Sequence, residues 1–260
     1  MKITNKLLFS FLCFVCSTPV AAENSSPSIE YRTLQLQFSQ WLKHAEDKQP
    51  IQGFKEQVTR TLIADSSVVS GGEFKLQTKN KQCVSFAPHR FFDKLTYKIA
   101  SSLFNSQCNV LIANTLHRKK TDNNNLKIDL ASYQNSAANA FLMAYSKTVE
   151  HFFIYQIHGF DANKRKTHAA KNADVILSQG IKAPSRTLQA VANCLNSDLN
   201  LNSLLYPNQV KELGATKNIL NIVAPTNSTF FHIELSYSLR KRLTSEPNFM
   251  SKFSQCVTLS

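Results

Sequence analysis

Glycine and proline are scarce in this chain, which has 6 glycines and 8 prolines among 260 residues. That composition excludes a collagen-like chain and a low-complexity linker protein. No segment repeats at a period of roughly 20–50 residues, so the sequence predicts neither a solenoid nor a propeller. Hydrophobic residues make up 43% of the chain and charged residues 18%. This is enough apolar material for a full core, and it excludes wholesale disorder.

Long apolar runs are also absent. No stretch after residue 22 has the roughly 18 consecutive apolar residues that predict a membrane-spanning helix. The run 7–15 is shorter, follows Lys2 and Lys6, and precedes small residues that end at Ala22. This order is typical of a secretory signal peptide. We therefore expect a leader over 1–22 and a mature protein that is periplasmic or secreted.

Acidic residues are few, with 17 Asp and Glu against 30 Lys and Arg and a formal net charge of +13. Loss of Lys2 and Lys6 with the leader lowers this charge to +11. Such an excess favours anionic partners, namely nucleic acid, acidic glycans, anionic lipid headgroups or acidic peptides. The charge alone does not choose among them.

Four cysteines remain after the leader: Cys83, Cys108, Cys194 and Cys256. An exported protein meets an oxidising compartment, so an even number of cysteines predicts disulfides. Four cysteines allow three connectivities, and their spacing does not select one. No CxxC motif remains after residue 22, which disfavours a zinc ribbon and a thioredoxin-type redox site.

The rest of the chain divides into two expected parts. Residues 23–80 predict an N-terminal helical segment, with helices near 31–45 and 54–63. Residues 81–260 predict an α/β domain in which short apolar strands alternate with helices. The expected strands are 83–87, 110–113, 152–157, 175–177, 219–223 and 230–235. Four helices are expected. The first begins near Phe91, the next two cover 137–149 and 184–194, and the last begins at residue 238.

Strands and helices in alternation predict an α/β fold with a mostly parallel or mixed twisted sheet that has helices on both faces.

Ligands bind such sheets at the carboxyl ends of the strands. Polar side chains follow three of the expected strands. His89 comes after the first, and Asp93 shares one face with it if 89–93 is helical. The ordinary alternative is a helix start with an acidic residue in its first turn.

The second polar position is His158, which directly follows the strand 152–157. Gly159 comes next and would let backbone or a ligand approach closely. The ordinary alternative is a turn histidine that is hydrogen-bonded to backbone.

The third position pairs His232 with Glu234, which share one face of their strand. A carboxylate in an apolar strand costs several kcal/mol if it is unpaired. Either a cation or a metal pairs with the carboxylate of Glu234, or its pKa is raised so that it is neutral. A general base beside a metal ion satisfies both conditions. The ordinary alternative is an edge strand with Glu234 in water.

These imidazoles and carboxylates match the needs of a zinc hydrolase, which uses three protein ligands and an open position for water. The compact HExxH motif is absent, and no GxSxG motif follows a strand, which disfavours a serine hydrolase. Arg118 follows the second strand, and Arg240 lies one helical turn beyond the third motif. Guanidinium groups bind carboxylates in bidentate fashion, although each arginine is also an ordinary surface residue.

The order of the motifs resembles one group of enzymes. Pro88-His89, Ile157-His158-Gly159 and His232-Ile233-Glu234-Leu235-Ser236 with Arg240 resemble the N-formylglutamate amidohydrolase-like and poly-γ-glutamate hydrolase-like zinc enzymes, relatives in architecture of zinc carboxypeptidases. The resemblance runs from about residue 83 to 243. It implies a phosphorylase/hydrolase-like fold with one zinc ion.

The resemblance also implies roles for single residues. His89, Asp93 and His158 would hold the metal, Glu234 would act as the base, and Arg118 would handle the substrate's carboxylate. The sequence departs from the family in two places. The first motif reads His-Arg-Phe-Phe-Asp instead of His-Ser-Gly, and no acidic residue directly precedes His158, where Gln156 lies two positions earlier.

The main hypothesis is an exported zinc-dependent amidohydrolase or carboxypeptidase-like hydrolase. It would cleave an amide or peptide bond in an acidic substrate, γ-glutamyl or cell-wall peptide in kind, with Arg118 or Arg240 orienting that substrate. The alternative is a non-enzymatic basic protein that binds an anionic cell-envelope polymer. A secreted nuclease is a third possibility, but the acidic cluster of a two-metal phosphodiesterase is not evident. Nucleic acid is therefore not the favoured partner.

Overall fold

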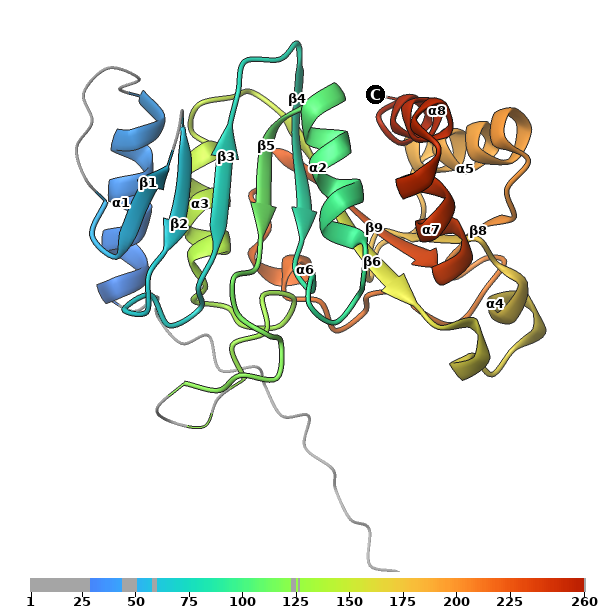
Figure 1. Ribbon diagram of the computed structural model, residues 1–260, viewed down its shortest axis with the longest axis horizontal. Coiled ribbons are helices and arrows are strands. Elements are labelled where there is room, and N and C mark those ends of the chain that lie inside the picture. The colour runs from blue at the N-terminus through green and yellow to red at the C-terminus, as the bar shows by residue number, and fades with distance from the viewer. Residues whose placement is uncertain (1–28, 44–50, 58–59, 123–124, 126, 260) are drawn as a thin grey trace, which may run out of the picture.

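The computed structural model describes residues 29–43, 51–57, 60–122, 125 and 127–259 (Figure 1). The predicted leader, 1–22, lies outside the described residues. The strands form one nine-stranded sheet in the order β1–β2–β3–β5–β4–β6–β9–β7–β8. They are β1 (Phe54–Gln57), β2 (Thr61–Ala64), β3 (Glu73–Leu76), β4 (Lys81–Ala87), β5 (Cys108–Ala113), β6 (Phe152–Phe160), β7 (Val175–Ser178), β8 (Ser203–Leu205) and β9 (Ser228–Ser236).

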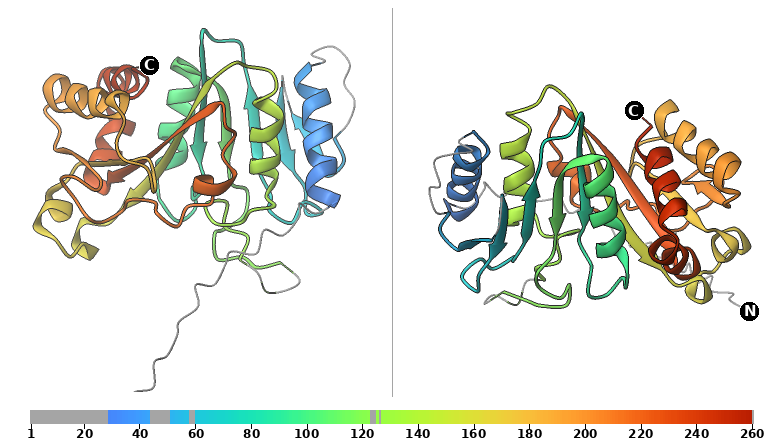
Figure 2. Two further views of the ribbon diagram at one scale, coloured as in Figure 1. Left: turned by 180° about the vertical axis from the view of Figure 1, so that it is seen from behind. Right: turned by 45° about the horizontal axis from the view of Figure 1, so that its top comes forward.

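Helices cover both faces of this sheet. They are α1 (Ile29–Lys43), α2 (Thr96–Ser106), α3 (Ala137–Tyr145), α4 (His168–Asn172), α5 (Arg186–Leu199), α6 (Leu220–Val223), α7 (Tyr237–Ser245) and α8 (Pro247–Val257), with a 3-10 turn η1 (Ala162–Lys164). One core packs α2, α5, α7 and α8 against the sheet, and a second core packs α1, α3 and α6 against it. Figure 1 shows α2 in front of the sheet, and Figure 2 shows α3 and α1 on the opposite side.

The centre of the sheet is parallel, because β5, β4, β6 and β9 run in the same direction. The pairs β1–β2, β2–β3, β3–β5 and β7–β9 are antiparallel. The predicted α/β class with a mixed sheet is therefore confirmed. In β4, Val84 and Phe86 join one core while Cys83 and Ala87 join the other. Burial on both faces explains why most residues of these central strands are apolar, without a polar residue at every second position.

Three expectations about secondary structure were wrong. Residues 54–63 form β1 and β2 instead of a helix, and β3 joins them to β5. The segment 23–80 is thus helical in α1, while 54–76 extends the main sheet. Residues 219–223 hold the short helix α6 instead of a strand. The helix after the first central strand begins at Thr96, and the turn before it leaves Phe91 and Phe92 about half exposed.

Two disulfides join segments on the α2 side of the sheet. Cys83 in β4 bonds to Cys108 at the start of β5. Cys194 in α5 bonds to Cys256 in α8. The structure therefore supplies the connectivity that the spacing left open.

None of the helices in the described part of the chain has the length and apolar character that a membrane span requires.

Candidate metal centre

His89 and Asp93 come together in a tight turn at the carboxyl end of β4. The backbone N–H groups of Phe92 and Asp93 both donate to the carbonyl of His89, at 2.8 Å each. This turn carries the Asp93 carboxylate back to His89, so that Oδ2 lies 3.4 Å from Nδ1 of the imidazole. Residues 89–93 form a turn instead of the helix that the expectation assumed, and this turn still brings the two side chains together.

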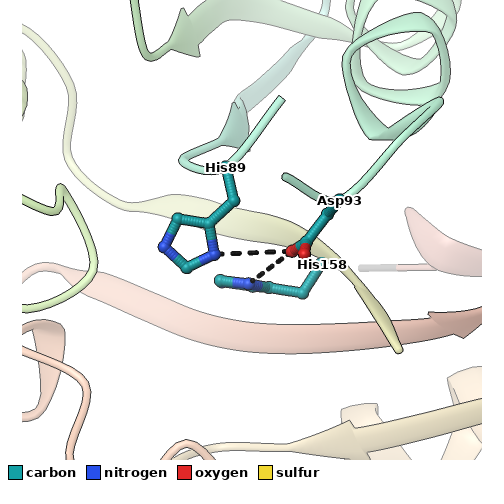
Figure 3. A group of neighbouring side chains, drawn as sticks. All are labelled: His89, Asp93 and His158. Atoms are coloured by element: carbon teal, nitrogen blue, oxygen red, sulfur yellow. Dashed lines mark ion pairs between the residues drawn. The ribbon is translucent and has the colours of Figure 1, made fainter. Parts of the chain in front are cut away.

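His158 approaches the same carboxylate from the neighbouring strand β6. Its Nδ1 lies 3.4 Å from Oδ2 of Asp93, and Figure 3 shows both imidazoles directed at that oxygen. The backbone N–H of Gly159 donates to Oδ2 at 3.2 Å and fixes the carboxylate. One ligand atom from each of His89, Asp93 and His158 therefore lies within 4.8 Å of the others, and all three residues are buried.

The spacing of these atoms fits a tetrahedral zinc site. Zinc lies about 2.0–2.1 Å from nitrogen and oxygen ligands, so two ligand atoms at a tetrahedral angle are about 3.3–3.4 Å apart. Both Nδ1–Oδ2 distances are 3.4 Å. Two imidazoles and one carboxylate form a donor set that zinc favours, with a fourth position left for water.

The outer nitrogen of each imidazole has its own partner. Nε2 of His89 lies 2.6 Å from Oδ1 of Asp129, and Nε2 of His158 lies 3.0 Å from Oε1 of Gln156. Both partners are acceptors, so a neutral ring donates its proton outward and has its lone pair on Nδ1, which faces Asp93. In His89 this atom is also approached by Nη1 of Arg118 at 3.2 Å. Metal-binding histidines are held in this way by carboxylates and carbonyls.

Burial and neighbouring charges determine the protonation of these groups. Burial tends to lower the pKa of His89, but Asp129 and Asp93 outweigh it and raise that pKa. Burial lowers the pKa of His158 to about 4, against the opposing influence of Asp93. Burial alone would raise the pKa of Asp93, but the two histidines hold it well below its usual range. These shifts favour an ionised Asp93 and a neutral His158, the forms that bind a metal, whereas the raised pKa of His89 favours a protonated ring that must lose a proton on metal binding.

Glu234 lies beside the three ligand atoms on the next strand, β9. It is the cross-strand partner of His158. A carboxylate oxygen of Glu234 and ring nitrogens of His158 and His232 lie within 4.8 Å of one another. Burial raises the pKa of Glu234 to about 8, and the charge of Asp93 acts in the same direction. A carboxyl group with such a pKa suits proton transfer near neutral pH.

His232 and Glu234 with His158 offer a second set of ligands, but this set fits a metal less well. Nδ1 of His232 and Oε2 of Glu234 are buried and have no hydrogen-bond partner among the described residues. A metal-binding imidazole normally donates its outer N–H to an acceptor. A third cluster, Cys194 with Asp198 and Cys256, has both sulfurs in a disulfide.

A cleft of about 590 Å³ opens onto the site. Asp93, His158 and Glu234 line it, together with the basic residues Arg118, Lys164 and Arg165. Arg118 donates to Oδ2 of Asp129 at 2.9 Å, and its Nη1 lies 3.2 Å from Nδ1 of His89. About a third of its side chain is exposed. Arg118 can thus present its guanidinium to a ligand in the cleft.

Arg240 has a different environment. Its guanidinium is buried and donates to three backbone carbonyls, those of Lys94, Phe160 and Leu235. With its donors engaged in this way, Arg240 holds the chain segments of the site together. Arg240 also lines the cleft, so its predicted contact with substrate stays a prediction beside this positioning role.

Two residues of the site, Asp129 and Gln156, are not among those predicted from the sequence. Asp129 follows a polar loop and belongs to no strand or helix, so no periodic pattern marked it. Gln156 was noted as a departure from the family, and its contact with His158 was not foreseen. Gln156 could have been found from its spacing, because it lies two residues before His158 in one strand and residues two apart in a strand share a face.

Comparisons with known proteins give a similar fold at low sequence identity. No protein-family model matches the sequence, and no curated protein matches it. A bacteriophage poly-γ-glutamate hydrolase structure is 14% identical, with a TM-score of 0.48 over 72% of this chain and 86% of that one.

Two further structures come from other enzymes. An N-formylglutamate amidohydrolase from Ralstonia eutropha is 11% identical, with a TM-score of 0.42 over 70% of this chain and 95% of that one. A metallo-carboxypeptidase from Pseudomonas aeruginosa is 13% identical, with a TM-score of 0.42 over 89% and 69%. All three are enzymes of the kinds that the sequence motifs resemble. Identities and TM-scores this low assign no activity to the present chain.

Proposed function

We propose that this protein is a zinc-dependent hydrolase that cleaves an amide or peptide bond in an acidic substrate. The convergence of His89, Asp93 and His158 carries the proposal. Nδ1 of each imidazole lies 3.4 Å from Oδ2 of Asp93, the spacing of tetrahedral zinc ligands, and the three buried residues offer ligand atoms within 4.8 Å of one another. A cation bound between these atoms would be attracted by the Asp93 carboxylate and by the lone pairs of the two imidazoles.

The residues of the cleft have separate tasks. His89, Asp93 and His158 would hold zinc, which when bound supplies Lewis acidity and lowers the pKa of water. Glu234 takes a proton from the attacking water and returns it to the leaving amine. Arg118, at the mouth of the cleft, stabilises negative charge that develops on the scissile carbonyl oxygen. Arg240 holds the segments that carry Asp93, His158 and Glu234.

The charges of the cleft favour an acidic substrate. Arg118, Lys164 and Arg165 line it, and the whole chain has a net charge of +13. Guanidinium and ammonium groups attract carboxylates and bind them with charge-assisted hydrogen bonds. A γ-glutamyl peptide or an acidic cell-wall peptide has this chemistry. The two disulfides and the leader expected over 1–22 support export to the periplasm or the medium, where cell-wall peptides are accessible.

The first experiment measures zinc in the purified protein. We expect one zinc per chain in the wild type and a large loss in His158→Ala. His168→Ala is the matched control, because His168 is exposed on α4, outside the cleft lining. Wild-type protein that takes up no zinc at neutral pH would refute the proposal.

The second experiment separates an enzyme from a binding protein. Glu234→Gln should keep zinc and lose about 10²–10⁴-fold in the rate of hydrolysis of acidic γ-glutamyl peptides. A non-enzymatic basic protein would instead bind the anionic polymer in a salt-dependent manner, with no effect of Glu234→Gln.

A further inference from the structure

A chain of side-chain amides leads from the backbone of α6 to His158. The backbone N–H of Leu220 donates to Oδ1 of Asn218 at 3.0 Å. Nδ2 of Asn218 donates to Oε1 of Gln156 at 2.6 Å. The same Oε1 lies 3.0 Å from Nε2 of His158. Asn218, Gln156 and His158 are all buried.

The direction of every hydrogen bond in this chain follows from its first donor. A backbone N–H can only donate, so it fixes the oxygen of the Asn218 amide toward Leu220 and the nitrogen toward Gln156. That nitrogen can only donate, so Gln156 presents its oxygen. An oxygen that faces Nε2 of His158 requires the ring proton on Nε2. The lone pair of His158 is then on Nδ1, the atom that faces Asp93.

The opposite orientation of Gln156 would close the metal site. If Gln156 turned its Nε2 toward His158, the ring proton would move to Nδ1 and point at Asp93. A protonated Nδ1 cannot bind a metal. In the observed orientation, Nε2 of Gln156 is buried with no hydrogen-bond partner among the described residues. An unpaired buried donor is costly, and this is the cost of holding Oε1 toward His158.

We propose that Asn218 and Gln156 are positioning residues that fix the tautomer of His158 and thereby open the site to a divalent cation. The inference rests on the proposed zinc site. In it, the side-chain amides of Asn218 and Gln156 determine that Nδ1 of His158, and not Nε2, is free to bind the metal. His89 differs, because the carboxylate of Asp129 holds its outer nitrogen.

The test measures zinc affinity by competition with a chelator. Gln156→Leu removes the acceptor and should weaken zinc binding about 10–100-fold, the usual effect of losing an outer partner. Gln156→Glu keeps an acceptor and should stay within about threefold of the wild type. Asn218→Asp keeps the size and the acceptor for Leu220 but loses the donor to Gln156, so we expect a loss of about tenfold or more.

Asn139→Leu is the matched control. Asn139 is a buried amide in α3 that bonds to the carbonyls of Tyr133 and Gln134, away from His158. It should change stability without changing zinc affinity. If Gln156→Leu does not fold, Asn218→Asp and the tautomer measurement still decide the question.

Nitrogen NMR of the zinc-free protein reads the tautomer of His158 directly. We expect the proton on Nε2 in the wild type and a shift toward Nδ1 in Asn218→Asp. A wild-type proton on Nδ1, or wild-type zinc affinity in Gln156→Leu or Asn218→Asp, would overturn the inference. A wild type that has the Nε2 tautomer but binds no zinc would refute the proposed function, and with it the role of the amides in opening the site.

Discussion

Gly159 and the guanidinium of Arg240 are in direct contact. A Cβ atom on Gly159 would lie 2.6 Å from Nε of Arg240, closer than such atoms can approach. The guanidinium reaches its three carbonyl acceptors because residue 159 has no side chain. These carbonyls lie one or two residues from three residues of the site, namely Asp93, His158 and Glu234.

Arg240→Lys should therefore destabilise the protein. Lysine lacks the planar fork that serves several carbonyls at once, and each buried carbonyl that loses its donor costs about 1–3 kcal/mol. We expect the free energy of unfolding to fall by about 2–4 kcal/mol in chemical denaturation. Arg242→Lys is the control, since Arg242 is about half exposed and should change stability by less than about 0.5 kcal/mol. Equal effects of the two substitutions would show that the carbonyl contacts of Arg240 contribute little.

Glu73 on β3 holds the turn that carries His89. Its carboxylate accepts from Arg90 at 2.5 Å, from the hydroxyl of Tyr97 at 2.7 Å, and lies 3.0 Å from Nζ of Lys75. Burial alone would raise the pKa of Glu73, but these partners outweigh it and lower the pKa. A carboxyl group with a lowered pKa in the folded state stabilises the protein above its unfolded pKa, about 4.3.

Glu73→Gln should thus reduce stability at neutral pH, by about 1–3 kcal/mol, because it leaves partly buried cationic and hydroxyl donors without a charged acceptor. The difference from the wild type should shrink as the pH falls below about 4.3 and through the lower folded pKa, where Glu73 gains a proton. Urea denaturation at several pH values measures this. Glu56→Gln, on the exposed face of β1, is the control. A difference that stays constant from neutral pH to about pH 3 would contradict the prediction.

The central strands and the meeting of His89, Asp93 and His158 were predictable, while the positions of Asp129 and Gln156 beside the two histidines were not. Residues 152–157 are apolar except for Gln156 because β6 is buried on both faces, and His158 stands out at their end. The strands β1 to β3 have four residues each, too few for a helical and a strand period to be told apart. Asp129 is 40 residues from His89 in sequence. Only the folded chain brings these two together.

The disulfide between Cys194 and Cys256 should contribute strongly to stability. It closes a loop with a sequence separation of 62 and ties α5 to α8. The loss of loop entropy in the unfolded chain predicts about 4 kcal/mol for a loop of this size. We expect that loss in urea denaturation of the double variant Cys194→Ala and Cys256→Ala. A loss below about 1 kcal/mol would show that the contacts between α5 and α8 hold these helices without the bond.

Zinc should raise the stability of the folded protein, because the three ligand atoms meet only when the strands are in place. At a free zinc concentration 100 times the dissociation constant, the gain is about 2.7 kcal/mol, or roughly 5–10 °C in the melting temperature. Asp93→Asn should abolish the gain, since the neutral amide loses the charge that holds the cation. Asp161→Asn is the matched control, because Asp161 lines the same cleft without facing the two histidines and its side chain is 50% exposed. If Asp93→Asn kept the full thermal shift while Asp161→Asn lost it, the cation would bind at the rim of the cleft and His89 and His158 would not be its ligands.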